Sequence, residues 1–339
     1  MKIFFLTQFY FDLHKPILAE LERQGHEVFL VQDVILPRDP YFRQISPVKR
    51  FLWKVRWNLC QTLPNYWRKK IETDDAYNEK YDLLLCIDGT SFHPFLLQHL
   101  KGNNPQIKAS LYLWDTNKYY DFFKYNKCFD KVQTFDLDDA IEEGVNLLPS
   151  YWCPSKVQNS KYKLLMVGSD HDDRIDIVTK IYNQLQDTGL SAYIRIIINE
   201  PKRTDGLCIF SKRREKNYMR RLSEFETKKK LPFTSVQSVP IEEIVYLIDS
   251  SDCILDTDKP IQTGVTQRVI WALARGKKVI STNYNLKRMP FYNDRQIRFI
   301  DRDNPIIDVN FINNNDTFVI CNEIANLRID KWIHLLIDI

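Results

Sequence analysis

The sequence predicts an α/β protein in which two Rossmann-like, doubly wound domains face a central cleft. Three observations predict this fold. Short runs of buried-looking strand residues alternate with helical patterns along the chain, as in parallel sheets covered by helices. A strand–helix–glycine–strand unit opens the chain, and a further strand–turn–helix unit begins near residue 162. The length of 339 residues is enough for two domains of ordinary size.

The composition narrows the class of protein. Hydrophobic residues make up 44% of the chain and charged residues 27%, which indicates a globular protein rather than a disordered one. The net charge of +4 is too small to indicate nucleic-acid binding, and we expect no nucleic-acid partner. No run approaches the roughly 18 apolar residues of a membrane-spanning helix. The N-terminus has too short an apolar core for a signal peptide, so we expect a cytoplasmic protein.

The chain contains 7 cysteines, at positions 60, 86, 128, 153, 208, 253 and 321. Their number is odd, and no two of them have Cys-x-x-Cys spacing. This pattern is typical of a reduced cytosolic protein with buried thiols, and it argues against a zinc site.

We expect residues 1–155 to form the first domain. Residues 2–6 are interpreted as its first strand, residues 14–24 as a helix that ends at Gly25, and residues 27–31 as the next strand. Ligands of doubly wound sheets bind beyond the carboxyl ends of the strands, so the loop of residues 7–14 belongs to the candidate site. This loop holds Asp12 and His14. The alternatives are a helix N-cap role for Asp12 and a surface position for His14.

Acidic residues follow three more predicted strands of this domain. Residues 81–87 are followed by Asp88, residues 109–114 by Asp115, and residues 131–135 by Asp136. A carboxylate that faces the cleft can accept a proton from a hydroxyl group. The candidate general bases, in order, are Asp115, Asp12 and Asp88, followed by His14. A structural role is the alternative for each of them.

Residues 47–70 form a segment in which basic residues alternate with Phe51, Trp53, Trp57 and Trp67. This composition suits a membrane interface or an anionic lipid carrier. The alternative is a helical arm that packs its aromatic side chains onto the first domain and leaves a basic face in water. Residues 201–230 form a second basic segment, which is either a solvated helix face or another contact with an anionic membrane.

We expect a linker over residues 147–160 and a second domain over residues 156–320. Its first strand, residues 162–167, is followed by Gly168 and Ser169, and a helix begins near Arg174. A turn of small residues at a helix N-terminus lets a diphosphate approach, which makes Arg174 a candidate phosphate partner. The alternative is a surface ion pair between Arg174 and either Asp170 or Asp173.

The stretch of residues 253–283 repeats the order of strand, loop, helix and strand. Its loop carries Gln262, Thr263, Gly264, Thr266 and Arg268. Amide groups at a helix start, with hydroxyl groups and an arginine beside them, suit a phosphate group; a capped helix with a solvated arginine is the alternative. We interpret the pair Asp256 and Asp258 as structural, and we expect no metal ion.

These motifs resemble those of bacterial GT-B glycosyltransferases of capsule and lipopolysaccharide biosynthesis, whose C-terminal domain is of the spore-coat glycosyltransferase type. The resemblance covers nearly the whole chain. The matching residues are Leu113, Trp114, Asp115, Phe135, Asp136, Asp139, Gly168, Ser169, His171, Asp173, Arg174, Leu255, Asp256, Pro260, Gln262, Gly264, Thr266, Arg268, Gly276, Lys277, Lys278, Thr282 and Asn283. The chain departs from the family pattern at Trp271, where a glutamate is usual, and at Asp88 and Thr90, where lysine and glutamate often flank the glycine.

The resemblance implies transfer of a sugar from a nucleotide-sugar donor to a hydroxyl group of a growing cell-surface glycan, in capsule, lipopolysaccharide or exopolysaccharide synthesis. The donor-binding residues that the resemblance implies are Gly168, Ser169, His171, Arg174, Gln262, Gly264, Thr266 and Arg268, to which the composition of the loop adds Thr263. It further implies a metal-independent reaction without a cofactor, and a glycan or lipid-linked acceptor. Peripheral contact with the inner face of the plasma membrane is expected, as is a helix within residues 321–339 that crosses back to the first domain. Two alternatives are a non-catalytic GT-B-like module that binds a glycan or a partner, and a phosphotransferase of the teichoic-acid kind.

Overall fold

The computed structural model describes residues 1–9, 12–156, 158–201, 203 and 211–339, with the side chains of residues 211–214 left out. Several residues singled out in the sequence therefore lie outside the description: positions 10 and 11 of the first loop, Lys202, Cys208, and the side chains of Lys212, Arg213 and Arg214.

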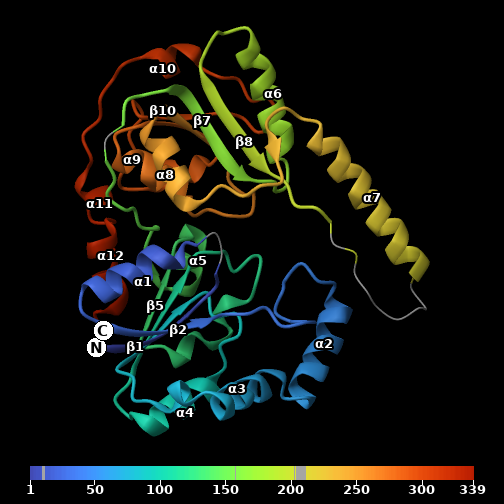
Figure 1. Ribbon diagram of the computed structural model, residues 1–339, viewed down its shortest axis with the longest axis vertical. Coiled ribbons are helices and arrows are strands. Elements are labelled where there is room, and N and C mark those ends of the chain that lie inside the picture. Colours follow the sequence, from blue (N-terminus) through green and yellow to red (C-terminus); the bar gives the residue numbers. More distant parts are fainter. Residues whose placement is uncertain (10–11, 157, 202, 204–210) are drawn as a thin grey trace.

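The first half of the chain forms a six-stranded parallel sheet in the order β2-β1-β3-β4-β5-β6 (Figure 1). Its strands are β1 (Lys2–Thr7), β2 (Glu27–Gln32), β3 (Leu83–Ile87), β4 (Lys108–Leu113), β5 (Lys131–Thr134) and β6 (Asn146–Leu147). Ile3 of β1 pairs with Val28 on one side and Leu83 on the other, so the strand order reverses at β1. All five residues of β3 are buried, as expected for a parallel strand that is covered on both faces.

The second half forms another six-stranded parallel sheet, in the order β12-β11-β10-β7-β8-β9. Its strands are β7 (Tyr162–Ser169), β8 (Ala192–Ile197), β9 (Thr234–Ser235), β10 (Ser251–Asp256), β11 (Lys278–Ser281) and β12 (Ile297–Phe299). The order reverses between β7 and β10. In open α/β sheets, ligands bind in the crevice beyond the carboxyl ends of the strands at such a reversal. Two doubly wound domains, as predicted, are confirmed.

Helices connect the strands of both sheets, and most of them cover a sheet face, whereas α2 stands at the edge of the first domain (Figure 1). They are α1 (His14–Arg23), α2 (Pro47–Leu59), α3 (Thr62–Thr73), α4 (Pro94–Asn103), α5 (Leu137–Glu143), α6 (Arg174–Gln186), α7 (Ser211–Lys229), α8 (Ile241–Asp249), α9 (Gln267–Ala274), α10 (Val309–Asn313), α11 (Asn322–Ala325) and α12 (Ile329–Ile337). Every residue of α9 from Val269 to Ala274 is buried. After α9 the chain turns at Gly276, where φ is +63° and a Cβ would lie 2.5 Å from the carbonyl oxygen of Phe318.

The end of the chain returns to the first domain. The indole of Trp332 in α12 is fully buried and lies against the rings of Tyr112 and Tyr151, with centroids 5.0 and 5.1 Å away. Ser110 of β4 donates a hydrogen bond of 2.7 Å to the carbonyl of Leu336. One cluster of buried side chains therefore continues from the first sheet through α12 and α9 into the second domain.

Three local features differ from the sequence prediction. The sequence does not predict the short strands β6 and β9, because a strand of two residues is too short to show an alternation of apolar and polar side chains. The expected single helix at the C-terminus is broken between α11 and α12, where Trp152 donates to the carbonyl of Leu327 and Ile329 donates to that of Trp152. These two hydrogen bonds hold the interdomain segment against the C-terminal helices.

Candidate active site between the two domains

At the point where the strand order of the second domain reverses, the side chains of two arginines lie close to one glycine. Gly168 lies near the carboxyl end of β7, Arg174 is the first residue of α6, and Arg268 is the second residue of α9. A Cβ at position 168 would lie 3.1 Å from Nη1 of Arg174 and 3.2 Å from Nη1 of Arg268. Glycine leaves room for both guanidinium groups above this strand, and a Cβ would force them to shift. Gly168 and Arg268, which the sequence singled out 100 positions apart, are thus brought together.

Arg174 is buried and holds the two central strand ends together. Its Nε donates to the hydroxyl of Thr257 at 2.8 Å, and its other nitrogens donate to the carbonyls of Ser169 and Thr257. Burial, together with the charge of Arg268, lowers the pKa of Arg174 to about 10. The alternative of a surface ion pair is wrong, because Asp170 pairs with Lys228, and Asp173 pairs with Arg302.

Arg268 is held from one side only. Its Nη2 lies 2.7 Å from Oδ1 of the fully buried Asp256. Thr266 donates to the same carboxylate at 2.7 Å, so this hydroxyl fixes Asp256. Nη1 of Arg268 makes no hydrogen bond within the described residues, and the side chain is 19% exposed. Arg268 is therefore anchored by its partner and keeps one donor group beside Gly168.

The histidine between β7 and α6 lies in a positive electrostatic environment. Burial, and after it the charges of Arg174, Lys259 and Arg268, lower the pKa of His171 to about 4. The imidazole is therefore neutral at pH 7. Three cations that act on one partly buried ring mark a region where an anion is favoured.

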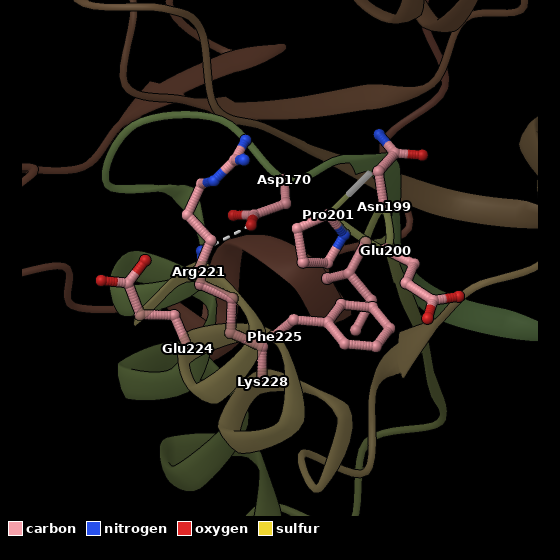
Figure 2. Close-up of a pocket in the computed structure, with 9 residues that line it drawn as sticks. Asp170, Asn199, Glu200, Pro201, Arg221, Glu224, Phe225 and Lys228 are labelled. Atoms are coloured by element: carbon pink, nitrogen blue, oxygen red, sulfur yellow. Dashed lines mark hydrogen bonds and ion pairs between the residues drawn. The ribbon is translucent and has the colours of Figure 1, made fainter. Parts of the chain in front are cut away.

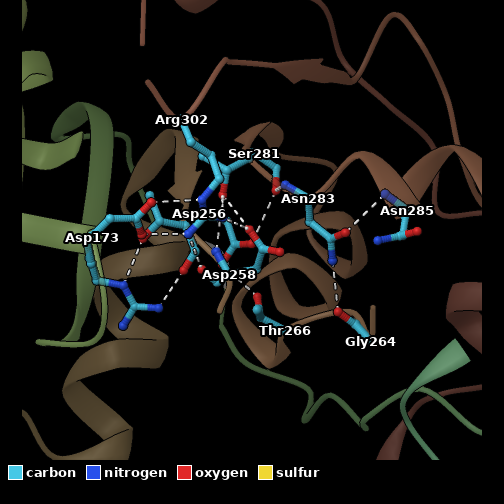
Figure 3. A network of polar contacts seen from close by, with 12 residues as sticks. Asp173, Asp256, Asp258, Gly264, Thr266, Ser281, Asn283, Asn285 and Arg302 are labelled. Atoms are coloured by element: carbon cyan, nitrogen blue, oxygen red, sulfur yellow. Dashed lines mark hydrogen bonds and ion pairs between the residues drawn. The ribbon is translucent and has the colours of Figure 1, made fainter. Parts of the chain in front are cut away.

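A second arginine network fixes the loops around this region (Figure 3). Arg302 follows β12 and binds Asp173 through two nitrogens, at 2.7 and 2.9 Å, while its Nη1 lies 2.7 Å from Asp258. Asp256 and Asp258 are thus both engaged by arginines and hydroxyl groups, in agreement with the structural interpretation of this pair. Among the described residues, no group of three or more His, Cys, Asp or Glu side chains is placed to hold a metal ion.

The loop before α9 is bound by the first domain. The backbone amides of Thr263 and Gly264 donate to the buried carboxylate of Asp136 at 2.8 and 3.2 Å, and the Thr263 hydroxyl donates at 2.7 Å. A Cβ at Gly264 would lie 2.4 Å from the ring of Phe135. The amides that the sequence assigned to phosphate are therefore engaged by an aspartate in this structure. The glycine permits close contact between the domains.

A predicted base and a predicted donor residue meet where the two domains touch. Nε2 of Gln262 donates to Oδ1 of Asp115 at 2.6 Å. Lys259 lies 3.7 Å from the other oxygen of this carboxylate and also stacks over the ring of Tyr119, at 5.4 Å. Asp115 remains 24% exposed. Asp115 is thus a partly exposed first-domain carboxylate at the loop before α9, whereas Asp136, which binds the same loop, is fully buried.

The other candidate bases have different environments. Asp12 is about half exposed, pairs with Lys15 at 2.8 Å and has a φ of +58°. The N-cap interpretation of Asp12 is wrong, because Leu13 occupies that position. Asp88 is buried and accepts a hydrogen bond from the amide of Trp114 at 3.1 Å. Burial, with the charge of Asp115, raises the pKa of Asp88 well above its usual value, which favours the neutral acid.

His14 is not on the surface, contrary to one of the two alternatives. It is 5% exposed and stacks on Phe9, with ring centroids 4.2 Å apart. Its Nδ1 is buried and has no hydrogen-bond partner within the described residues. Burial lowers the pKa of His14.

The unusual tryptophan of α9 lies in the packing between the domains. Trp271 is 3% exposed, and its Nε1 donates to the carbonyl of Tyr151 at 2.9 Å. The indole therefore points toward the segment that joins the domains. It does not take over the role of the glutamate that the resemblance leads one to expect at this position.

A hollow of about 340 Å³ lies between α7 and the segments that follow β7 and β8 (Figure 2). Its lining residues are Asp170, Ile198, Asn199, Glu200, Pro201, Arg221, Glu224, Phe225 and Lys228. Asp170 follows directly on Ser169, so the hollow borders the arginine region. The sequence did not single out Glu200; its only signal was a carboxylate soon after the second strand of a doubly wound domain.

No protein-family model matches the sequence, and no curated protein sequence matches it. Among solved structures, sucrose-phosphate synthase from Thermosynechococcus elongatus is similar in fold. It has a TM-score of 0.50 at 12% identity, over 90% of this chain and 86% of that one. The chain has the GT-B fold. An α,α-trehalose-phosphate synthase (UDP-forming) from Burkholderia vietnamiensis has a TM-score of 0.47 at 10% identity, over 98% of this chain and 93% of that one.

The predicted GT-B fold is thus confirmed, whereas no comparison tests the capsule and lipopolysaccharide branch of the resemblance. None of the helices that the structure describes is long and apolar enough to cross a membrane.

Proposed function

We propose that this protein is a glycosyltransferase that moves a sugar from a nucleotide-sugar donor to a hydroxyl group of a glycan or lipid-linked glycan. One observation carries the proposal: Nη1 atoms of Arg174 and Arg268 approach one glycine at the strand reversal of the second domain. This is where a doubly wound domain binds the pyrophosphate of its ligand. Fixed cations at a leaving diphosphate stabilise the charge that develops during transfer.

The two arginines have different roles in this proposal. Arg268 binds a phosphate oxygen directly, because its Nη1 has no partner among the described residues and its side chain is partly exposed. Arg174 supplies charge and shape, because three of its nitrogens are engaged by Ser169 and Thr257. The diphosphate charge is neutralised by these arginines, and the reaction proceeds without a metal ion.

We place the nucleoside of the donor over the end of β8, in the hollow of Figure 2. In doubly wound nucleotide-binding domains an acidic residue beyond the phosphate turn accepts the ribose hydroxyl groups. Glu200 lines the hollow, is exposed, and follows the second strand of this domain. It is the carboxylate that we assign to the ribose.

Asp115 is the base of the proposed reaction. It is partly exposed, it belongs to the first domain, and it touches Gln262 of the donor-side loop. Asp88 does not serve, because it is buried and its neutral form is favoured. An acceptor hydroxyl beside Asp115 would lose its proton to the carboxylate as the bond to the sugar forms. The acceptor that fits the resemblance is a cell-surface glycan assembled on the inner face of the plasma membrane.

A thermal-shift series with UDP, GDP, CMP and dTDP and their sugar derivatives tests the proposal. A ligand that binds the folded state raises the melting temperature, so one nucleotide class should stabilise the protein. Sugar transfer is then measured with the matching nucleotide sugar. The absence of a shift with every nucleotide would overturn the proposal in favour of a binding module. Turnover of a CDP-alditol with transfer of its phosphate would instead identify a phosphotransferase.

A further inference from the structure

Helix α2 exposes an apolar stripe that nothing in the described chain covers. Its exposed apolar side chains are Val48 (72%), Phe51 (67%), Leu52 (59%), Val55 (41%) and Leu59 (80%). Their spacing of three or four residues places them on one face of the helix. The helix stands at the edge of the first domain, away from the sheets (Figure 1). An exposed stripe of this kind indicates an interaction surface.

The opposite face of the same helix packs onto the first domain. Trp57 is buried, and Trp53 is partly buried. At about 100° per residue, these two indoles point away from the apolar stripe. Trp67 of α3 is fully buried and donates to the carbonyl of Ser91 at 2.8 Å. The interpretation as an arm that packs its aromatic side chains onto the first domain therefore holds for the tryptophans, whereas Phe51 and its aliphatic neighbours face outward.

All the charged residues of α2 are basic. They are Lys49, Arg50, Lys54 and Arg56. On a helical projection, Lys54 lies at one border of the apolar stripe, while Lys49 and Arg56 lie at the other. Helix α3 continues with Arg68, Lys69 and Lys70, and the first acidic residue after Asp39 is Glu72.

We propose that α2 is a docking surface for an anionic phospholipid bilayer, on which the helix lies parallel to the membrane plane. An apolar face bordered by lysine and arginine fits such an interface, where acyl chains accept the apolar side chains and anionic headgroups meet the cations. A second copy of α2 is a poor occupant, because two basic borders would face each other. The inference goes beyond the proposed function and does not depend on it.

A chain of contacts connects this helix to the candidate base. Lys54 lies over the ring of Tyr41, at 5.9 Å, in the segment that leads into α2. Phe42 of that segment packs edge-on against Tyr119, with centroids 5.6 Å apart. Tyr119 lies beneath Lys259, which is 3.7 Å from Asp115. These contacts form one packed path from α2 to Asp115 at the contact between the domains.

Co-sedimentation of the full chain with vesicles tests the proposal. Vesicles of phosphatidylcholine with phosphatidylglycerol are compared with pure phosphatidylcholine vesicles at low and high salt. Wild-type protein should bind the anionic vesicles at least about 10-fold more tightly than the neutral ones, and salt should weaken this binding. The double variant Phe51→Ser/Leu52→Ser should lose about 10-fold or more of its binding.

The control variant is Ile141→Ser/Val319→Ser, which removes two exposed apolar side chains elsewhere and should bind like wild type. Thermal melting and nucleotide-induced stabilisation should be unchanged in both double variants, so that failure of membrane docking is separate from failure of the proposed function. The proposal is overturned if wild-type protein ignores anionic vesicles at low salt. The proposal is equally overturned if Phe51→Ser/Leu52→Ser binds anionic vesicles as wild type does. It is also overturned if the only effect of these substitutions is the loss of a concentration-dependent dimer, because the stripe would then join two copies of the chain.

Discussion

Gln262 of the second domain donates a hydrogen bond of 2.6 Å to Asp115 of the first domain. The loop that leads to Arg268 is therefore in direct contact with this carboxylate of the first domain. Opening of the two domains must break this bond. In the proposed reaction, the state that binds the donor diphosphate is also the state in which the base is positioned.

Replacement of Asp115 by asparagine should abolish sugar transfer and leave nucleotide binding intact. The asparagine side chain keeps the shape and can still accept from Gln262, but it cannot take a proton. A positioned general base contributes at least about 100-fold in rate, so turnover should fall by that factor or more. Product formation and nucleotide-induced thermal shift are measured on the same preparation. Asp121→Asn, at an exposed carboxylate paired with Arg43, is the control. Loss of nucleotide binding together with turnover would assign Asp115 a structural role.

Replacement of Arg268 by lysine should weaken nucleotide binding by about 10-fold while the protein stays folded. Lysine keeps a charge for Asp256 but lacks the fork that reaches both this carboxylate and a phosphate. Alanine is less informative, because a buried aspartate without its cation costs about 3 kcal/mol of stability. Isothermal titration with the preferred nucleotide measures the change. Arg295→Lys, in an exposed ion pair with Asp316, should have no effect. Equal affinity in Arg268→Lys and wild type would remove Arg268 from the phosphate site.

Replacement of Asp136 by asparagine should loosen the contact between the domains. The carboxylate accepts from the Thr263 amide and hydroxyl and from the Gly264 amide, and it is fully buried. Hydrogen bonds to a charged acceptor contribute about 1.5–3 kcal/mol each, so we expect a loss of about 3 kcal/mol in the free energy of unfolding. Urea denaturation measures it.

The matched control for this prediction is Asp138→Asn, two residues further along. Asp138 also connects the domains, through Arg288, but its partners are exposed. Exposed ion pairs contribute at most about 1 kcal/mol. A similar loss of stability in both variants would contradict the special role of Asp136.

The environment of His171 predicts a pH dependence. Its pKa in the folded protein is about 4, because of burial and the nearby cations, against 6.5 as its ordinary value. The unfolded chain therefore binds more protons between these pH values, and the contribution of His171 to stability is full above pH 6.5 and is lost as the pH falls toward 4. His171→Gln should flatten this part of the stability profile.

The same histidine reports on the donor. A diphosphate beside it offsets the charges of Arg174 and Arg268 and favours the protonated imidazole, so its pKa should rise when nucleotide binds. An NMR titration of the His171 ring with and without nucleotide measures the change. A pKa near 6.5 in the free protein, or one that nucleotide leaves unmoved, would contradict an anion site at this position.

The sequence predicted the elements of the site because strand ends and glycine turns are local signals. Parallel strands bring their carboxyl ends to one edge, so Gly168 and Arg268 could be expected to meet although they are far apart in the chain. Contacts between the domains carry no such signal. Nothing in the local sequence pattern shows that Asp136 accepts hydrogen bonds from the amides of Thr263 and Gly264, or that Arg302 connects two loops. The burial of Asp88 likewise depends on how the neighbouring strand end covers it.

Glu200 is the residue of the proposed donor site that the sequence did not reveal, and its replacement by glutamine tests the placement of the nucleoside. A carboxylate accepts hydrogen bonds from both ribose hydroxyl groups, whereas the amide offers one acceptor oxygen. We expect nucleotide affinity to fall by about 10-fold, or roughly 1.4 kcal/mol. Glu224→Gln is the matched control, because this carboxylate lines the same hollow but pairs with Arg220 at 2.9 Å. The corresponding 2′-deoxynucleotide should bind wild type and Glu200→Gln equally, with the reduced affinity that Glu200→Gln has for the ribonucleotide. If removal of the 2′-hydroxyl group weakens binding to Glu200→Gln as much as it weakens binding to wild type, the ribose does not bind at Glu200 beside β8.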